Sequence, residues 1–243
     1  MKNLFFLLLI LPLTSCGTSD LNWLILSPNN VEGLTNLKFL LSGISTTIYI
    51  SVVSIIISMA IGFVVAVPSL ATNKFLTYLN IGYVEIVRAV PLLVLILWIY
   101  YGLPIMTGIS FSPFVSGIIA LSISESAFQA EIFRAGINSI KKAQWEDGSS
   151  LGLNLLRKLR LVILPQAIKN ILPAIGNQFV YVLKMSSLVS IIGIGDLTRK
   201  ANELVVTTYR PLEIYTCLIF EYMILILIVS FFVRKLEKNL KKD

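Results

Sequence analysis

The sequence contains no histidine, and only two of its 243 residues are cysteine. Histidine is the most common general base and metal ligand in proteins, so we expect neither a metal ion nor a cofactor. Cys16 and Cys217 lie in separate apolar stretches and do not form a disulfide framework. A nucleotide-binding loop of the form Gly-x-x-x-x-Gly-Lys-Ser/Thr is also missing. The sequence therefore favours a protein that is not an enzyme.

Charge is scarce as well. Charged residues make up 14% of the chain and hydrophobic residues 56%, with a mean hydropathy of +0.84. A soluble domain carries about 25% charged residues, so the excess apolar surface is expected to face lipid. The net charge of +7 might suggest nucleic acid as a partner, but the basic residues cluster beside apolar runs, as in membrane proteins. We expect an integral membrane protein and no nucleic-acid partner.

Long apolar runs predict an all-α, polytopic membrane protein with about five transmembrane helices, since one helix needs about 20 residues to cross a bilayer. Pro104, Gly108 and Pro113 divide one uncharged run into two of these spans. The predicted spans are 40–67, 86–103, 113–132, 171–194 and 214–233.

Basic residues predict the orientation. They are richest in the segment 134–169 and in the tail after residue 233. Placing both in the cytoplasm gives an external N-terminus and a cytoplasmic C-terminus, which an odd number of spans requires.

The N-terminus has features of a secretory signal. The apolar run 4–13 follows a lysine, is too short to span a bilayer and ends in small residues. We therefore separate a segment 1–20 from a single domain, 21–243. The residues before Cys16 also resemble a bacterial lipoprotein cleavage box, in which Cys16 would be acylated; the alternative is an uncleaved interfacial helix. Asn, Pro and Gly predict a loop over 17–36.

A polar island interrupts the spans between the third and the fourth. It predicts a short helix around Ala143–Leu151, terminated by Gly152, and then a basic amphipathic helix around Leu155–Ile163. Trp145 and Leu151 are candidates to fill a pocket on a partner. The alternative is a solvated loop beside a helix that lies on the membrane.

This island resembles the cytoplasmic signature of bacterial ABC importer permeases, which is Glu-Ala-Ala, three residues, Gly, nine residues and Ile-x-Leu-Pro. Here Glu146-Asp147-Gly148, Gly152 and Val162–Pro165 keep both spacings. Segments 83–93, 130–137, 162–167, 176–179 and 183–190 resemble the polar amino-acid branch of this family, of the histidine, glutamine and arginine type. The resemblance covers about residues 33–236.

The resemblance implies a permease subunit of an ATP-driven importer of polar amino acids in the bacterial inner membrane. Its expected partners are a separate ATPase dimer, an external substrate-binding protein, a second permease subunit and membrane lipid. Asp147 and Gly148 stand where the family has alanines, so Asp147 either meets a basic site on the ATPase or weakens the coupling. The expected coupling residues are Trp145, Glu146, Asp147, Gly148, Leu151, Gly152 and Pro165.

Charges at membrane depth are functional candidates, since their burial in lipid is costly. Glu125 and Lys184 could line a path and pair with the ammonium and carboxylate of an amino acid, or they could pair with each other. Together with Glu221 they could instead form the relay of an autonomous ion-coupled secondary transporter or channel. A weaker alternative is a lipid-anchored assembly factor that depends on Cys16. The spacings Glu85–Arg88 and Glu131–Arg134 predict local ion pairs.

Overall fold

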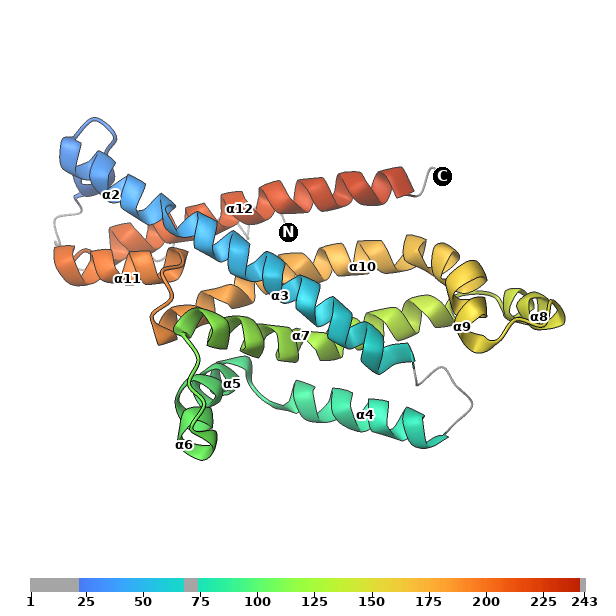
Figure 1. Ribbon diagram of the computed structural model, residues 1–243. Helices are drawn as coiled ribbons and strands as arrows, with labels where there is room; N and C mark the ends of the chain where they lie inside the picture. Colours follow the sequence, from blue (N-terminus) through green and yellow to red (C-terminus); the bar gives the residue numbers. More distant parts are fainter. Residues whose placement is uncertain (1–21, 68–73, 241–243) are drawn as a thin grey trace, which may run out of the picture.

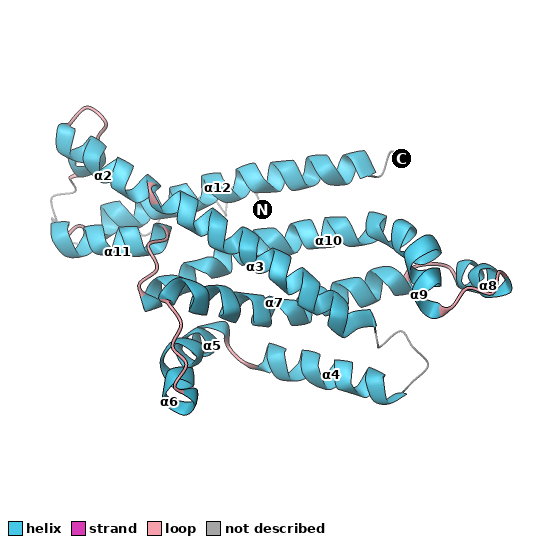
Figure 2. Ribbon diagram, viewed as in Figure 1, coloured by secondary structure: helices cyan, strands magenta, loops and turns pink. Residues whose placement is uncertain are grey.

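The computed structural model describes residues 22–67 and 74–240, and in these residues all regular structure is helical (Figures 1 and 2). The predicted all-α class is therefore confirmed. The predicted signal segment 1–20 and Cys16 lie outside the described residues.

The chain enters the fold through η2 (Trp23–Leu26), α2 (Val31–Leu41) and α3 (Gly43–Ala66). The loop predicted up to residue 36 is wrong at its end, because α2 begins at Val31. The side chain of Asn30 caps this helix by accepting a hydrogen bond from the amide of Glu32 at 3.3 Å. An Asn cap with an acidic residue in the first turn is a helix start signal that outweighs the polar composition.

The second predicted span, 86–103, is wrong. α4 (Lys74–Ala89) ends inside it, and the helical path α5 (Leu92–Leu97), η4 (Trp98–Gly102) and α6 (Leu103–Thr107) leaves at 90° to α4. Pro91 causes the break, since the residue before a proline is disfavoured in a helix. Pro104, one of the three residues predicted to divide this run, lies in the first turn of α6, where proline is tolerated.

α7 (Pro113–Asn138) is the central helix and packs on α3, α4, α5 and α10 (Figure 1). Ser112 caps it by accepting a hydrogen bond from the amide of Val115. Gly62 of α3 lies so close to α7 that an added Cβ atom would come within 2.5 Å of the Gln129 Cβ atom. Small residues of this kind let two membrane helices approach closely.

After α7 come α8 (Lys142–Ser150), α9 (Leu155–Lys158), η5 (Leu159–Ile163) and α10 (Leu164–Met185). The last three follow one another without a break, so the predicted amphipathic helix 155–163 is continuous with the fourth span. η6 (Ser186–Ile192), α11 (Leu197–Thr208) and α12 (Pro211–Leu240) complete the described chain.

Three helical segments of the described chain are long and apolar enough to cross a membrane, namely Val31–Ala66, Leu159–Ile192 and Pro211–Asn239. The bent pair of α4 with α5 and α6 makes a fourth if it counts as one span. α7, the third predicted span, is not among these segments, and its polar side chains Glu125 and Gln129 are buried. The polytopic fold is confirmed, and the count of five spans is approximate.

Candidate functional site

The inner side of α8 is fixed to its own chain. Trp145 packs against the buried cluster that includes Ile137, Leu159 and Ile163. Gly148 is buried against Lys158, whose Cγ atom would lie 2.5 Å from an added Cβ atom. Trp145 is half-buried and Gly148 is buried by these contacts, and their role at the contact with a partner stays a prediction.

Two hydrogen bonds add to this attachment. The Lys158 Nζ atom donates to the Ser149 hydroxyl at 2.6 Å, and the side-chain Nε2 atom of Gln166 in α10 donates to the Gln144 Oε1 atom at 2.9 Å. α8 thus connects directly to the helical path that leads into the membrane.

The outer side of α8 is free and acidic. Glu146, Asp147, Ser150 and Leu151 are exposed on one side of the helix, and the Leu151 side chain is 74% exposed. Lys142 reaches the Glu146 carboxylate at 3.5 Å, an exposed pair of small energetic value. Asp147 forms no ion pair with any residue that the structure describes. The exposed side of α8 is therefore acidic, with one large apolar side chain at its end.

Gly152 ends α8, as predicted. Its φ of +68° is left-handed, a conformation that favours glycine. The Gly152 amide donates to the carbonyl of Ser149 at 2.9 Å, and the Leu153 amide donates to that of Gly148 at 3.1 Å. These two bonds form a Schellman motif, which fixes where the chain leaves the helix.

Glu125 and Lys184 are not brought together. Glu125 is 1% exposed on α7 and accepts a hydrogen bond from the Gln178 amide of α10. Lys184 is exposed on α10 and has no ion pair among residues 22–67 and 74–240. The interpretation as a mutual pair is therefore wrong.

Glu221, the third candidate, is buried on α12. Neither of its carboxylate oxygens has a hydrogen-bond partner in the described chain.

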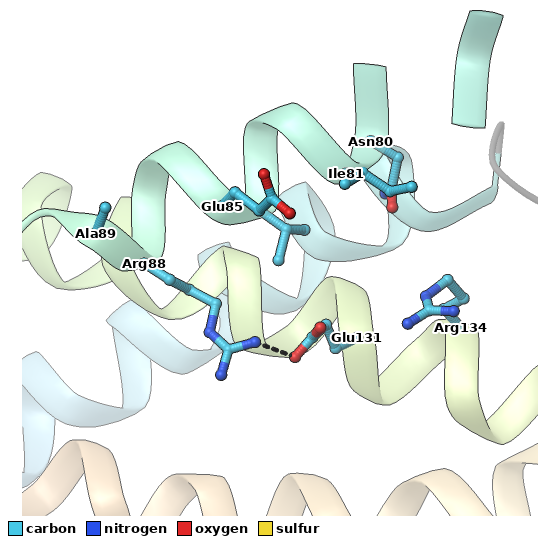
Figure 3. A pocket seen from close by; sticks show the side chains of 8 residues that line it. Asn80, Ile81, Glu85, Arg88, Ala89, Glu131 and Arg134 are labelled. Atoms are coloured by element: carbon cyan, nitrogen blue, oxygen red, sulfur yellow. Dashed lines mark hydrogen bonds and ion pairs between the residues drawn. The ribbon is translucent and has the colours of Figure 1, made fainter. Parts of the chain in front are cut away.

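The predicted pairs of Glu85 with Arg88 and of Glu131 with Arg134 are absent from the described residues. Arg88 of α4 instead forms an ion pair with Glu131 of α7 (Figure 3). The Arg88 guanidinium also lies 4.8 Å from the centre of the Phe128 ring. The local spacing could not reveal this pair, because it depends on how two helices face each other.

A charged pocket of about 470 Å³ surrounds this pair between α4 and α7 (Figure 3). A second hollow of about 450 Å³ lies between α7 and α10, and Glu131 borders both. The sequence signal for the first pocket is the spacing Glu-x-x-Arg in both helices, which by itself predicts only local pairs. The first pocket is lined by Asn80, Ile81, Val84, Glu85, Arg88, Ala89, Glu131 and Arg134.

α11 lies at the opposite end of the bundle from α8 (Figure 1), and Asp196 caps it. Its carboxylate accepts hydrogen bonds from the Arg199 amide at 2.9 Å and from the Tyr222 hydroxyl at 3.4 Å. Burial raises the pKa of Asp196 to about 6, against the lowering by these hydrogen bonds. The carboxylate holds α11 against α12, and we did not identify it from the sequence.

Apolar helices with buried polar side chains, and one short helix held out at an end, define a multi-pass membrane protein with a polar interior. The model of the family described as "binding-protein-dependent transport system inner membrane component" matches residues 58–242. The chain belongs to this family.

Relatives support the assignment. The arginine transport system permease protein ArtQ of Bacillus subtilis is 34% identical over 210 residues, which is 86% of this chain and 96% of ArtQ. The glutamine transport system permease protein GlnP of Escherichia coli K12 is 32% identical over 84% of this chain and 94% of GlnP.

Solved structures agree. The crystal structure of an amino acid ABC transporter with histidines has a TM-score of 0.77 at 37% identity, and covers 85% of this chain and 96% of its own. The inward-facing MetNI methionine ABC transporter, at 20% identity, has a TM-score of 0.74 over 84% of this chain and 97% of its own, and shares the fold. The family resemblance that the sequence suggested is confirmed.

Proposed function

We propose that this chain is the permease subunit of an ATP-driven importer of polar amino acids. It pairs with a second permease subunit of the same or a similar sequence, receives its substrate from an external binding protein and docks on an ATPase dimer. Its N-terminus is external and its C-terminus cytoplasmic. The substrate class rests on relatives whose names refer to arginine and glutamine.

The observation that carries the proposal is the two-sided geometry of α8. Its inner side is fixed to α9, η5 and α10, and its outer side is free. A helix held in this way transmits a displacement to the membrane helices instead of absorbing it. ATP binding would then shift the balance between inward-open and outward-open states, to the extent that the ATPase binds the two states of the permease differently.

The exposed side chains on the outer side of α8 indicate which groups the ATPase must present to it. We infer that Leu151 enters an apolar pocket of the ATPase, and that a basic group lies opposite Asp147. This favours the matched basic site over weakened coupling, because an unpaired carboxylate desolvated at an interface would cost binding energy.

The test is co-purification of the ATPase with Asp147→Lys and Leu151→Ala permeases. We expect both variants to lose most of the bound ATPase and of the ATP-dependent uptake. Glu32→Lys is the matched charge reversal, because Glu32 is exposed on α2, far from α8. Uptake driven by an ion gradient in the purified chain without any ATPase would instead support the secondary transporter or channel.

A further inference from the structure

A small apolar groove lies where the end of α3 meets the start of the helical path that leads into α10. It has a volume of about 280 Å³ and is lined by Phe63, Val67, Leu159, Arg160 and Leu164. Four of these residues are apolar, and Arg160 supplies the charge. Pockets for drug-sized ligands have volumes of about 300–1,000 Å³, so this groove suits one part of a longer molecule.

The apolar walls of the groove belong to the packed core. Leu159 is buried in the cluster that includes Ile163, and Phe63 and Leu164 pack against this cluster. Phe63 is also held by an edge-to-face contact with Phe133, at 5.4 Å between the ring centres. The shape of the groove is therefore set by side chains that the fold holds in place.

The groove lies at the ends of two candidate membrane spans. One span, Val31–Ala66, ends next to Val67, and another, Leu159–Ile192, begins in the groove itself. α8 packs on η5 at this end, so in the proposed orientation the groove lies at the cytoplasmic boundary of the membrane. Val64 and Leu161, which neighbour lining residues in sequence, are largely exposed, as expected for side chains that face acyl chains.

Two arginines at the groove are exposed. Arg160 follows Arg157 by three residues, about one helical turn, which places both on the same side. Neither forms an ion pair within the described part of the chain. Lys158, which lies between them, differs because its ammonium donates to Ser149 of α8. A guanidinium group binds phosphate oxygens through two parallel hydrogen bonds, so the chemistry of the two arginines suits a phosphate.

We propose that this groove binds an anionic phospholipid of the inner leaflet, with part of an acyl chain between α3 and η5 and the phosphate on Arg160 and Arg157. The choice of leaflet rests on the orientation given in the proposed function. An anionic headgroup is favoured because no carboxylate of the described chain pairs with either arginine, and each basic residue at a membrane surface attracts anionic lipid. The bound lipid joins α3 to the helical path that carries α8.

Lipid binding to the purified permease, alone and with its ATPase, tests the headgroup contact. Native mass spectrometry gives the affinities for phosphatidylglycerol and for phosphatidylcholine with the same acyl chains. We expect Arg160→Gln to lower the affinity for phosphatidylglycerol by about 5-fold, the contribution of one basic residue at a membrane surface, and to leave that for phosphatidylcholine unchanged.

Lys38→Gln is the matched control for the change of charge, because Lys38 is exposed on α2, at the opposite end of the bundle from α8 (Figure 1). We expect it to keep the wild-type affinity for phosphatidylglycerol. The same loss in both variants, or no loss in Arg160→Gln, would overturn the site.

The acyl-chain contact is tested with Val67→Phe, which puts a larger apolar side chain into the groove and leaves the charge unchanged. We expect it to lower the affinity for phosphatidylglycerol while the ATPase stays bound. Inorganic phosphate in molar excess should not displace the lipid, since it has no acyl chain. Displacement by phosphate, or full lipid affinity in Val67→Phe, would mean that the arginines bind a phosphate alone and would overturn the groove.

The ATPase is the competing occupant, because α8 lies beside the groove. Loss of the ATPase from the Arg160→Gln permease on co-purification, with unchanged lipid affinity, would assign the arginines to that contact and overturn the lipid site. The two proposals fail separately. Absence of ATP-dependent uptake by the unaltered chain would sink the proposed function and leave the lipid affinities as measured, whereas unchanged lipid affinity in Arg160→Gln would sink the lipid site alone.

Discussion

α8 and α10 each present an exposed polar face, but the two faces have different meaning. In water, exposed Glu146 and Asp147 are ordinary, and α8 becomes informative only because its other side is fixed. In a membrane, exposed Asn177 and Lys184 are informative by themselves, because lipid penalises them. The same composition therefore indicates a docking surface in one place and a water-lined surface in the other.

The largest expected effect comes from making the exposed polar face of α10 apolar, which includes Asn177, Tyr181 and Lys184. The triple variant Asn177→Leu, Tyr181→Leu and Lys184→Leu removes the polar lining and adds surface that lipid accepts, so the helix still inserts. We expect uptake to fall by at least about 100-fold, since each lost transition-state interaction of 1.36 kcal/mol costs about tenfold in rate. The measurement is ATP-dependent uptake of labelled amino acids in proteoliposomes.

The matched control lies on α12, another candidate span, whose exposed side chains Ile219, Ile224 and Leu227 are apolar. Ile219→Leu, Ile224→Leu and Leu227→Ile change shape but not polarity. Uptake close to wild type is expected there. If the α10 triple variant transported equally well, the contrast between the two helices would have no functional meaning.

The next effect comes from detaching the inner side of α8. Gly148→Leu places a large side chain where the Lys158 stem lies and pushes α8 away from α9. We expect ATP hydrolysis to continue while uptake per ATP falls by about 10-fold, a loss of about 1.4 kcal/mol. The measurement is the ratio of the two rates. Ser150→Leu is the control for size on the outer side, and it should reduce ATPase binding instead.

The contrast also shows what the sequence could predict. The helix at 143–151 and its end at Gly152 were predictable, because cap and turn signals act within a few residues. The packing of the Trp145 side chain against its own chain was not predictable, because a nine-residue helix with few apolar residues does not indicate which of its sides contacts the rest of the protein. The pair of Arg88 with Glu131 and the separation of Glu125 from Lys184 depend on helix placement. The break at Pro91 was not predicted, because the apolar, uncharged run on its C-terminal side gives no sign that a new helix begins at Leu92.

A smaller effect is expected at the end of α8. Gly152→Ala puts a Cβ atom on a left-handed residue, which costs about 1–2 kcal/mol. Gly152→Asn should cost less, since asparagine tolerates this conformation. Hydrogen exchange should accelerate at the amides of Gly152 and Leu153 in the alanine variant while exchange in α10 stays unchanged. Equal exchange in both variants would mean that the Schellman motif does not fix the end of α8.

The smallest effect is expected at the ion pair of Arg88 with Glu131, which joins α4 to α7 beside the polar face of α10. Both side chains are about two-fifths exposed, at 42% and 39%, so solvent screens the pair. A double-mutant cycle with Arg88→Gln and Glu131→Gln should give a coupling energy of about 0.5–1 kcal/mol in thermal unfolding of the detergent-solubilised permease. The coupling should shrink as salt is added, because exposed charges are screened. A coupling of several kcal/mol that salt does not change would mean that water does not reach this pair, and that the water-lined surface ends at α10.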